Sequence, residues 1–221
     1  MSAELDEEAL SHLRRRVRLI GILSAAEEAG LVSLPTQQLH TVGYFADALA
    51  PVWGLRILDA RVLKLRAGPT SPLLQADLDR LVGIGVVIVS AVRHIEDADG
   101  LWRLDADYCL NRTLAQPILD KARTFERFAT ELDFLREVIF ALSGLGAMGI
   151  LSAGTSDASY GDEMIDLGGM VDIAGDESEP NATARVAIRF RELLQPEIAL
   201  SDSEMVHLYV RELYRRLETN D

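Results

Sequence analysis

The sequence has few of the residues on which metal sites and nucleophilic active sites usually depend. It contains one cysteine, Cys109, and four histidines that fall on separate segments without a metal-ligand spacing. A single cysteine excludes an intramolecular disulfide and is typical of a reducing compartment. No phosphate-binding loop or nucleophile elbow is present. We therefore expect no cofactor, no metal and no enzymatic activity.

The N-terminus and the longest uncharged run bear on location. Residues 1–9 are acidic and have neither the basic nor the apolar region of a signal peptide. Residues 138–156 lack charge, but four glycines interrupt them and no basic flank follows. We interpret that run as a buried helix end and loop, and we expect a cytoplasmic protein with no membrane segment. The run also holds Gly144-Leu145-Gly146-Ala147-Met148-Gly149, a dinucleotide fingerprint without the required preceding strand, which we attribute to chance.

Basic residues are also few, with 22 Lys and Arg against 35 Asp and Glu. The formal net charge is -13, the isoelectric point is about 4.7, and 48% of the residues are apolar. These values indicate a folded globular protein whose free surface repels a phosphate backbone and suits a basic protein partner. We therefore expect the protein to contact DNA only as part of a complex.

The N-terminal segment, residues 1–34, is predicted to be one helix that ends at Gly30. We interpret its four arginines as a solvent-exposed helix face that is paired with nearby acidic residues, in preference to a nucleic-acid contact. They are Arg14, Arg15, Arg16 and Arg18. In the next helix, His40 and Tyr44 lie one turn apart. We interpret them as residues at the rim of the core whose polar groups have hydrogen-bond partners. The other interpretation is a functional site.

Residues 35–115 have the element order of a winged helix. An apolar helix reaches Leu49, a basic strand covers 57–65, and Gly68-Pro69 marks a turn. Ser71-Pro72 is a strong helix start, and strands at 86–92 and 101–104 flank an acidic turn. The strand and its flanks carry the basic residues expected to contact a partner: Arg56, Arg61, Lys64 and Arg66. The helix at 71–82 is expected to point Gln75, Asp77, Asp79 and Arg80 outward, and two carboxylates there oppose binding to duplex DNA.

Residues 116–221 are predicted to form a helical second domain, with a degenerate second winged helix as one version of it. A long helix is expected to begin at Pro117, with Phe125, Phe128 and Leu132 as candidate partner contacts or as core. Residues 157–180 form an acidic loop in which Asp172 and Asp176 are the candidate contacts for a basic partner. Helices at 185–194 and 201–217 complete a fold that is mainly α with a small β-hairpin (α+β).

Three segments resemble a known family. They are Leu39-His40-Thr41-Val42-Gly43-Tyr44-Phe45-Ala46-Asp47, Gly68-Pro69-Thr70-Ser71-Pro72, and Asp77-Leu78-Asp79-Arg80-Leu81-Val82 with Gly85-Val86-Val87. Together they look like the Panacea (SocA-like) modules, although His40-Thr41 stands where that family has a lysine. More loosely, the chain is similar to the middle components of ABC-three-component and Lamassu-type defence systems. That resemblance implies a winged-helix accessory subunit beside an SMC-like ATPase and an effector nuclease subunit.

The sequence thus favours a non-catalytic accessory subunit that bridges protein partners in a bacterial antiviral defence complex, and it leaves self-association open. One alternative is a winged-helix transcriptional regulator that binds DNA. The other is a small enzyme with a site within residues 144–176.

Overall fold

The structure, a computed structural model, describes residues 2–96, 100, 102–161, 164–174, 179–193 and 199–220. Its helices are α1 (Ser2–Glu28), α2 (Thr36–Ala48), the short 3-10 helix η1 (Ala50–Trp53), α3 (Pro72–Gly83), α4 (Arg112–Arg123), α5 (Glu126–Ser143), α6 (Gly146–Ser156), α7 (Ala182–Leu193) and α8 (Asp202–Asn220). Its strands are β1 (Leu34–Pro35), β2 (Arg61–Leu65), β3 (Gly68–Thr70), β4 (Val87–Glu96), β5 (Trp102–Leu110) and β6 (Met170–Asp172). The expectation of a mainly helical α+β fold is confirmed.

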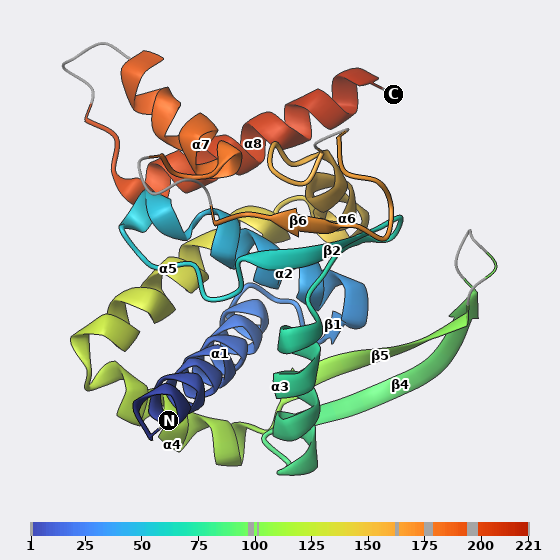
Figure 1. The fold of residues 1–221 in the computed structure, drawn as a ribbon, viewed down its shortest axis with the longest axis vertical. Helices are drawn as coiled ribbons and strands as arrows, with labels where there is room; N and C mark the ends of the chain where they lie inside the picture. The colour runs from blue at the N-terminus through green and yellow to red at the C-terminus, as the bar shows by residue number, and fades with distance from the viewer. Residues whose placement is uncertain are drawn as a thin grey trace.

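Helix α1 ends where the sequence predicts. Gly30 adopts a left-handed backbone (φ +84°), and the backbone N–H of Leu31 donates to the Ala26 carbonyl at 2.8 Å. This bond closes the last turn and satisfies a carbonyl that the helix leaves without a partner. Helix α2 follows and is buried on nearly every side, between α1 and the C-terminal helices (Figure 1).

The first sheet has the strand order β1–β5–β4, and both pairings are antiparallel. Helix α3 packs against β4, and it begins where expected because the Leu74 N–H donates to the Ser71 side chain at 3.0 Å. The hairpin of β4 and β5 is longer than predicted and extends away from the body of the molecule (Figure 1). A register shift between Ser90 and Arg93 interrupts it, and Ala91 there has a φ of 48°.

A second sheet, with strand order β3–β2–β6, packs through β3 against α2 and α6. Strands β2 and β3 come from the segment that connects α2 to α3, whereas β6 comes from the acidic segment some hundred residues later. This sheet therefore joins residues on both sides of the expected boundary at 115/116. Gly68 starts β3 with a φ of +127°, a conformation that glycine accepts without strain.

The prediction of one long helix from Pro117 is wrong. Pro117 lies inside α4, this helix ends at Arg123 with Thr124 as its C-cap, and α5 begins at Glu126. Helices α5 and α6 are bent by 108° relative to each other. Among the described helices, none is by itself long and apolar enough to span a membrane.

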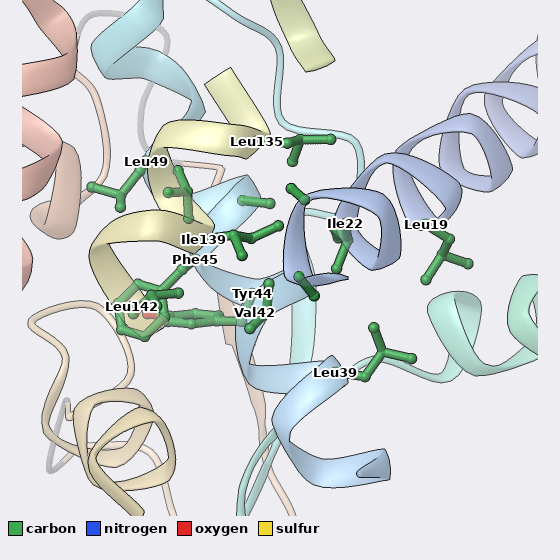
Figure 2. Packing of buried hydrophobic residues seen from close by; sticks show 14 of the residues in the cluster. Leu19, Ile22, Leu39, Val42, Tyr44, Phe45, Leu49, Leu135, Ile139 and Leu142 are labelled. Atoms are coloured by element: carbon green, nitrogen blue, oxygen red, sulfur yellow. The ribbon is translucent and has the colours of Figure 1, made fainter. Parts of the chain in front are cut away.

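One hydrophobic core connects α1, α2 and α5 (Figure 2). Leu19 and Ile22 of α1 point toward the side of α2 that carries Leu39, and these side chains are at most 1% exposed. Each such side chain contributes about 1.5–3 kcal/mol when it is fully buried. Gly21 lets α5 approach closely, because a Cβ there would lie 2.6 Å from Leu132 Cδ2.

Candidate partner-binding surfaces

The basic strand and the acidic segment, predicted separately as partner contacts, pair with each other. Arg61 of β2 lies opposite Asp172 of β6, and Arg61 Nε is 3.4 Å from Asp172 Oδ2. The Lys64 N–H donates to the Gly169 carbonyl, and the Lys64 ammonium lies 5.9 Å from the centre of the Tyr160 ring. Because Arg61 and Asp172 are both more than half exposed, their ion pair contributes at most about 1 kcal/mol.

The other two basic candidates, Arg56 and Arg66, are exposed on the segments that flank β2. Asp176 lies outside the described residues. The structure therefore brings together Arg61, Lys64 and the β6 side of the acidic segment, but in a contact that the chain makes with itself.

The interpretation of the α1 arginines as a solvated face is wrong for Arg15, Arg16 and Arg18, which pair with acids of other helices. Arg15 Nε donates to Asp77 Oδ2 at 2.7 Å, and Arg16 Nε donates to Asp77 Oδ1 at 2.9 Å. Asp77, expected to point outward from α3, is buried in this contact. Burial opposes the ionised carboxylate, but the two guanidinium donors outweigh it and hold the pKa of Asp77 below its usual value.

Arg18 forms a second buried pair. Its Nε donates to Glu131 Oε1 of α5 at 2.6 Å, and a terminal nitrogen donates to Asp47 Oδ1 of α2 at 2.5 Å. Burial opposes its charge, but the two carboxylates more than compensate and raise the pKa of Arg18. These arginines tie α1 to α2, α3 and α5, so their role in the structure is to fix helices.

Asp157 is likewise not part of a solvated loop. The Tyr44 hydroxyl donates to its Oδ2 at 2.9 Å, and the Tyr209 and Thr183 hydroxyls each donate to its Oδ1 at 2.9 Å. The Ser159 N–H completes the set at 2.9 Å. Burial raises the pKa of Asp157, although these donors oppose the shift. The carboxylate links α2 with α7 and α8.

His40 has a structural role and does not share a site with Tyr44. Its Nδ1 accepts the Ser71 N–H at 3.2 Å, and its Nε2 lies 3.1 Å from Gln75 Oε1. The acceptor role of Nδ1 places the proton of the neutral ring on Nε2. Burial lowers the pKa of His40, which is the direction that favours this neutral form. The reading of His40 and Tyr44 as satisfied core residues agrees with these contacts.

The exposed side of α3 has no net charge. Its exposed members are Pro72, Leu73, Ala76, Asp79, Arg80 and Gly83. The neighbouring hairpin exposes the large apolar side chains Ile88, Val92, Trp102 and Leu104. It also exposes Arg93, whose guanidinium is paired with Asp105 and Asp107. Trp102 is 67% exposed and pairs across the strands with Glu96, while Leu104 pairs with His94. We call these two sets of residues together the α3–hairpin surface.

An apolar groove lies where α1 passes α4 and the start of α5. It has a volume of about 360 Å³, and its lining residues are Leu13, Val17, Pro117, Ile118, Lys121, Ala122, Phe125 and Phe128. The rings of Phe125 and Phe128 meet edge to face with centres 6.4 Å apart. The Lys121 ammonium lies 5.5 Å from the centre of the Phe125 ring. Phe125 and Phe128 are thus at a surface, as one of the two readings of this helix proposed.

Leu132, the third apolar candidate, is 5% exposed and packs against α1, so as a surface contact it is wrong. The α1 wall of the groove was missed as well. Leu13, on this wall, is 51% exposed and was not among the residues expected to contact a partner. Its position beyond the end of the buried stripe, one turn before Val17, was the available signal.

A smaller polar pocket of about 80 Å³ lies farther along the same three helices. Its lining residues are Gly21, Ser24, Ala25, Glu28, Arg112, Gln116, Leu119, Arg123, Leu132 and Arg136. Each arginine already has a carboxylate partner: Arg112 pairs with Glu27 at 2.6 Å, Arg123 with Asp133 at 2.9 Å and Arg136 with Glu28 at 3.2 Å. Each of these ion pairs uses one guanidinium nitrogen and leaves further N–H donors on the same group. One of them, on Arg112 Nη1, donates to the Ser24 hydroxyl at 3.2 Å.

In the part of the chain that the structure describes, no three His, Cys, Asp or Glu side chains lie close enough together to hold a metal ion. The glycine motif at 144–149 follows helix α5 where a dinucleotide fold would have a strand, and Gly146 starts helix α6. No protein-family model matches the chain, and no curated protein is similar to it in sequence.

Proposed function

We propose that this protein is a non-catalytic subunit that joins protein partners in a multi-protein complex, and that it binds one of them through a winged-helix module. The order α1, β1, α2, α3, β4, β5, with the sheet order β1–β5–β4, supports the winged helix. In this interpretation α3 is the helix that a DNA-binding relative would insert in the major groove, and the β4–β5 hairpin is the wing. The segment with η1, β2 and β3 takes the place of a tight turn between α2 and α3.

The observation that carries the proposal is the character of the α3–hairpin surface. A helix that reads duplex DNA presents basic and hydrogen-bonding side chains to phosphates and base edges. Here the exposed side of α3 has one acid, Asp79, and one base, Arg80, among small and apolar residues. The wing adds Trp102 and Leu104, and aromatic residues are enriched where proteins meet proteins.

The class of partner comes from the resemblance to accessory components of ATPase-based defence systems. We propose an SMC-like ATPase or its effector nuclease subunit as the partner, with DNA contacted only through the assembled complex. The net charge of -13 supports a partner with a basic surface.

The test is co-expression of this chain with the products of the neighbouring genes, followed by purification and mass measurement of any complex; the proposal requires that one of these products is an SMC-like ATPase. We expect a stable complex that Trp102→Glu with Leu104→Glu disrupts, while Cys109→Ser on β5 leaves it intact. The isolated chain should bind a 30-base-pair duplex no more tightly than the non-specific range of about 10⁻⁴–10⁻⁶ M at physiological salt. Tight duplex binding that Arg80→Glu abolishes would instead show a DNA reader.

A further inference from the structure

The β4–β5 hairpin contains a strained backbone position near the point where it leaves the body of the molecule. Ala91 of β4 has a φ of 48°, and it is the one described residue other than glycine with a positive φ. This conformation is unfavourable for a residue with a Cβ, because the Cβ approaches the following carbonyl oxygen too closely. It persists only where the surrounding contacts enforce it, so the contacts around Ala91 indicate what the strain is for.

The strained residue belongs to a β-bulge. Two residues of β4, Ala91 and Val92, lie opposite a single residue of β5, Ala106. An extra residue of this kind bends its strand and increases the local twist. The bulge therefore changes the direction of the hairpin at this point.

One side chain holds the bulge in this conformation. The Arg93 guanidinium donates through Nη1 to the Ala91 carbonyl at 3.1 Å. Its Nη2 lies 2.5 Å from Asp105 Oδ2 and 3.1 Å from Asp107 Oδ1 on the neighbouring strand. Arg93 thus connects the strained residue of β4 to two carboxylates of β5, and charge-assisted contacts of this kind are among the stronger hydrogen bonds. We call Ala91, Arg93, Asp105 and Asp107 the bulge clamp.

The bulge clamp lies where the hairpin changes from buried to exposed (Figure 1). On β5, Ala106 and Asp105 are 2% and 5% exposed, whereas Leu104 and Trp102 are 58% and 67% exposed. Ala106 is fixed to the start of α2, because its N–H donates to Thr36 Oγ1 at 3.0 Å and its carbonyl accepts from the same hydroxyl at 3.2 Å. In the described part of the chain, β5 pairs beyond this point with β4 alone. The direction of the exposed part is therefore set at the bulge.

The extra residue contributes direction and not strand pairing. Without Ala91, Val92 would lie opposite Ala106 and every later pair of the hairpin would stay as it is. The exposed part beyond the bulge carries Trp102 and Leu104 of the α3–hairpin surface. A surface that is held in one orientation binds a partner without the entropy loss that ordering a flexible surface requires.

We infer that the bulge clamp is a positioning device, which holds the outer part of the hairpin in one direction and so presents Trp102 and Leu104 to the partner in a fixed orientation. Its role in binding rests on the function proposed above, whereas the fixed direction is a property of the chain alone. Arg93 is the positioning residue, since it acts on the docking residues only through the bulge.

The experiment measures the direction of the hairpin in the full-length chain by double electron–electron resonance. Nitroxide labels are attached at Ala76→Cys on the exposed side of α3 and at Glu96→Cys on β4, with Cys109→Ser to remove the native thiol. We expect one narrow distance distribution. Deletion of Ala91 should shift its mean by several ångströms, because the bend is lost, and Arg93→Gln should broaden it.

Ala91→Gly is the matched control. Glycine accepts a positive φ without strain and keeps the carbonyl that Arg93 contacts, so the distance distribution should stay unchanged. Arg93→Gln/Asp105→Asn is measured as well, because it removes the buried carboxylate that Arg93→Gln leaves without a cation. Circular dichroism confirms that each labelled variant is folded, so a change in distance is separated from a loss of structure.

The inference is overturned if the labelled parent chain already gives a broad distribution, or if both Arg93 variants leave its mean and width unchanged. Deletion of Ala91 without a shift would also overturn it, since the bulge would then set no direction. A fixed hairpin in a chain that forms no complex would contradict the proposed function alone. A complex that forms equally well with Arg93→Gln would show that the bulge clamp does not serve binding.

Discussion

The buried contact of Arg18 allows the sharpest test of what holds these helices together. The Arg18 side chain is 5% exposed, and it contacts Asp47 at 2.5 Å and Glu131 at 2.6 Å. Replacing it with methionine keeps a flexible chain of similar length but leaves two buried carboxylates without a cation. The replacement should therefore destabilise the protein although it adds an apolar group to the interior.

The magnitude follows from the fate of the carboxylates. Removing one partner of a buried ion pair costs about 3–5 kcal/mol, because the remaining charge stays desolvated. Since a change of 1 kcal/mol shifts the melting temperature of a domain of this size by about 2–4 °C, Arg18→Met should lower it by about 6–20 °C. The double variant Arg18→Met/Glu131→Met removes one of the orphaned charges, so it should be more stable than Arg18→Met alone.

The assay is urea unfolding followed by circular dichroism, together with thermal melts of the same variants. Arg61→Met is the control, because the exposed pair of Arg61 with Asp172 contributes at most about 1 kcal/mol. The reasoning is refuted if Arg18→Met lies within 1 kcal/mol of the wild type, or if adding Glu131→Met destabilises the protein further.

Three further substitutions test the packing and the buried polar groups. Gly154→Ala would place its Cβ 2.6 Å from the Thr41 methyl group and should cost about 1–3 kcal/mol in urea unfolding, whereas Gly144→Ala, at a φ of -62°, should be nearly neutral. Tyr209→Phe removes a donor to Asp157 and should cost about 1.5–3 kcal/mol by the same assay. Because burial raises the pKa of Asp157, its protonation stabilises the fold, and that contribution is complete below the unfolded value and lost as the pH rises through the folded value. The wild type should accordingly gain stability relative to Asp157→Asn as the pH falls from 7 toward 4, and the opposite slope would contradict the assigned direction.

The helix ends that depend on a few neighbouring residues could be predicted from the sequence. The end of α1 at Gly30 and the start of α3 at Ser71 are set by capping chemistry within a few residues, so they could be predicted. Strand β6 could not, because it has three residues and pairs with β2 about 110 positions earlier. The break after α4 was also missed, since the apolar spacing continues through Thr124 as if the helix did.

In the candidate site, too, residues that follow a local pattern could be predicted, whereas those that depend on helix packing could not. Exposed Phe125 and half-buried Phe128 could be named from one apolar pattern, but the opposite wall at Leu13 depends on how α1 packs against α4. The burial of Arg15 and Asp77 was hidden for a similar reason. A charged residue in a sequence is most often solvated, and only the meeting of α1 with α3 supplies the partner that allows both to be buried.

The pairing of β6 with β2 also affects how the chain is completed during synthesis. The first sheet has all its strands once Leu110 has emerged from the ribosome, whereas β2 must wait for Asp172. At translation rates of about 5–20 residues per second, this delay is about 3–12 s. During that interval one edge of β2 has no neighbour, and Arg61 and Lys64 on this unfinished strand, together with Arg56 and Arg66 beside it, give the nascent chain a basic, self-repelling edge that discourages pairing with a second chain.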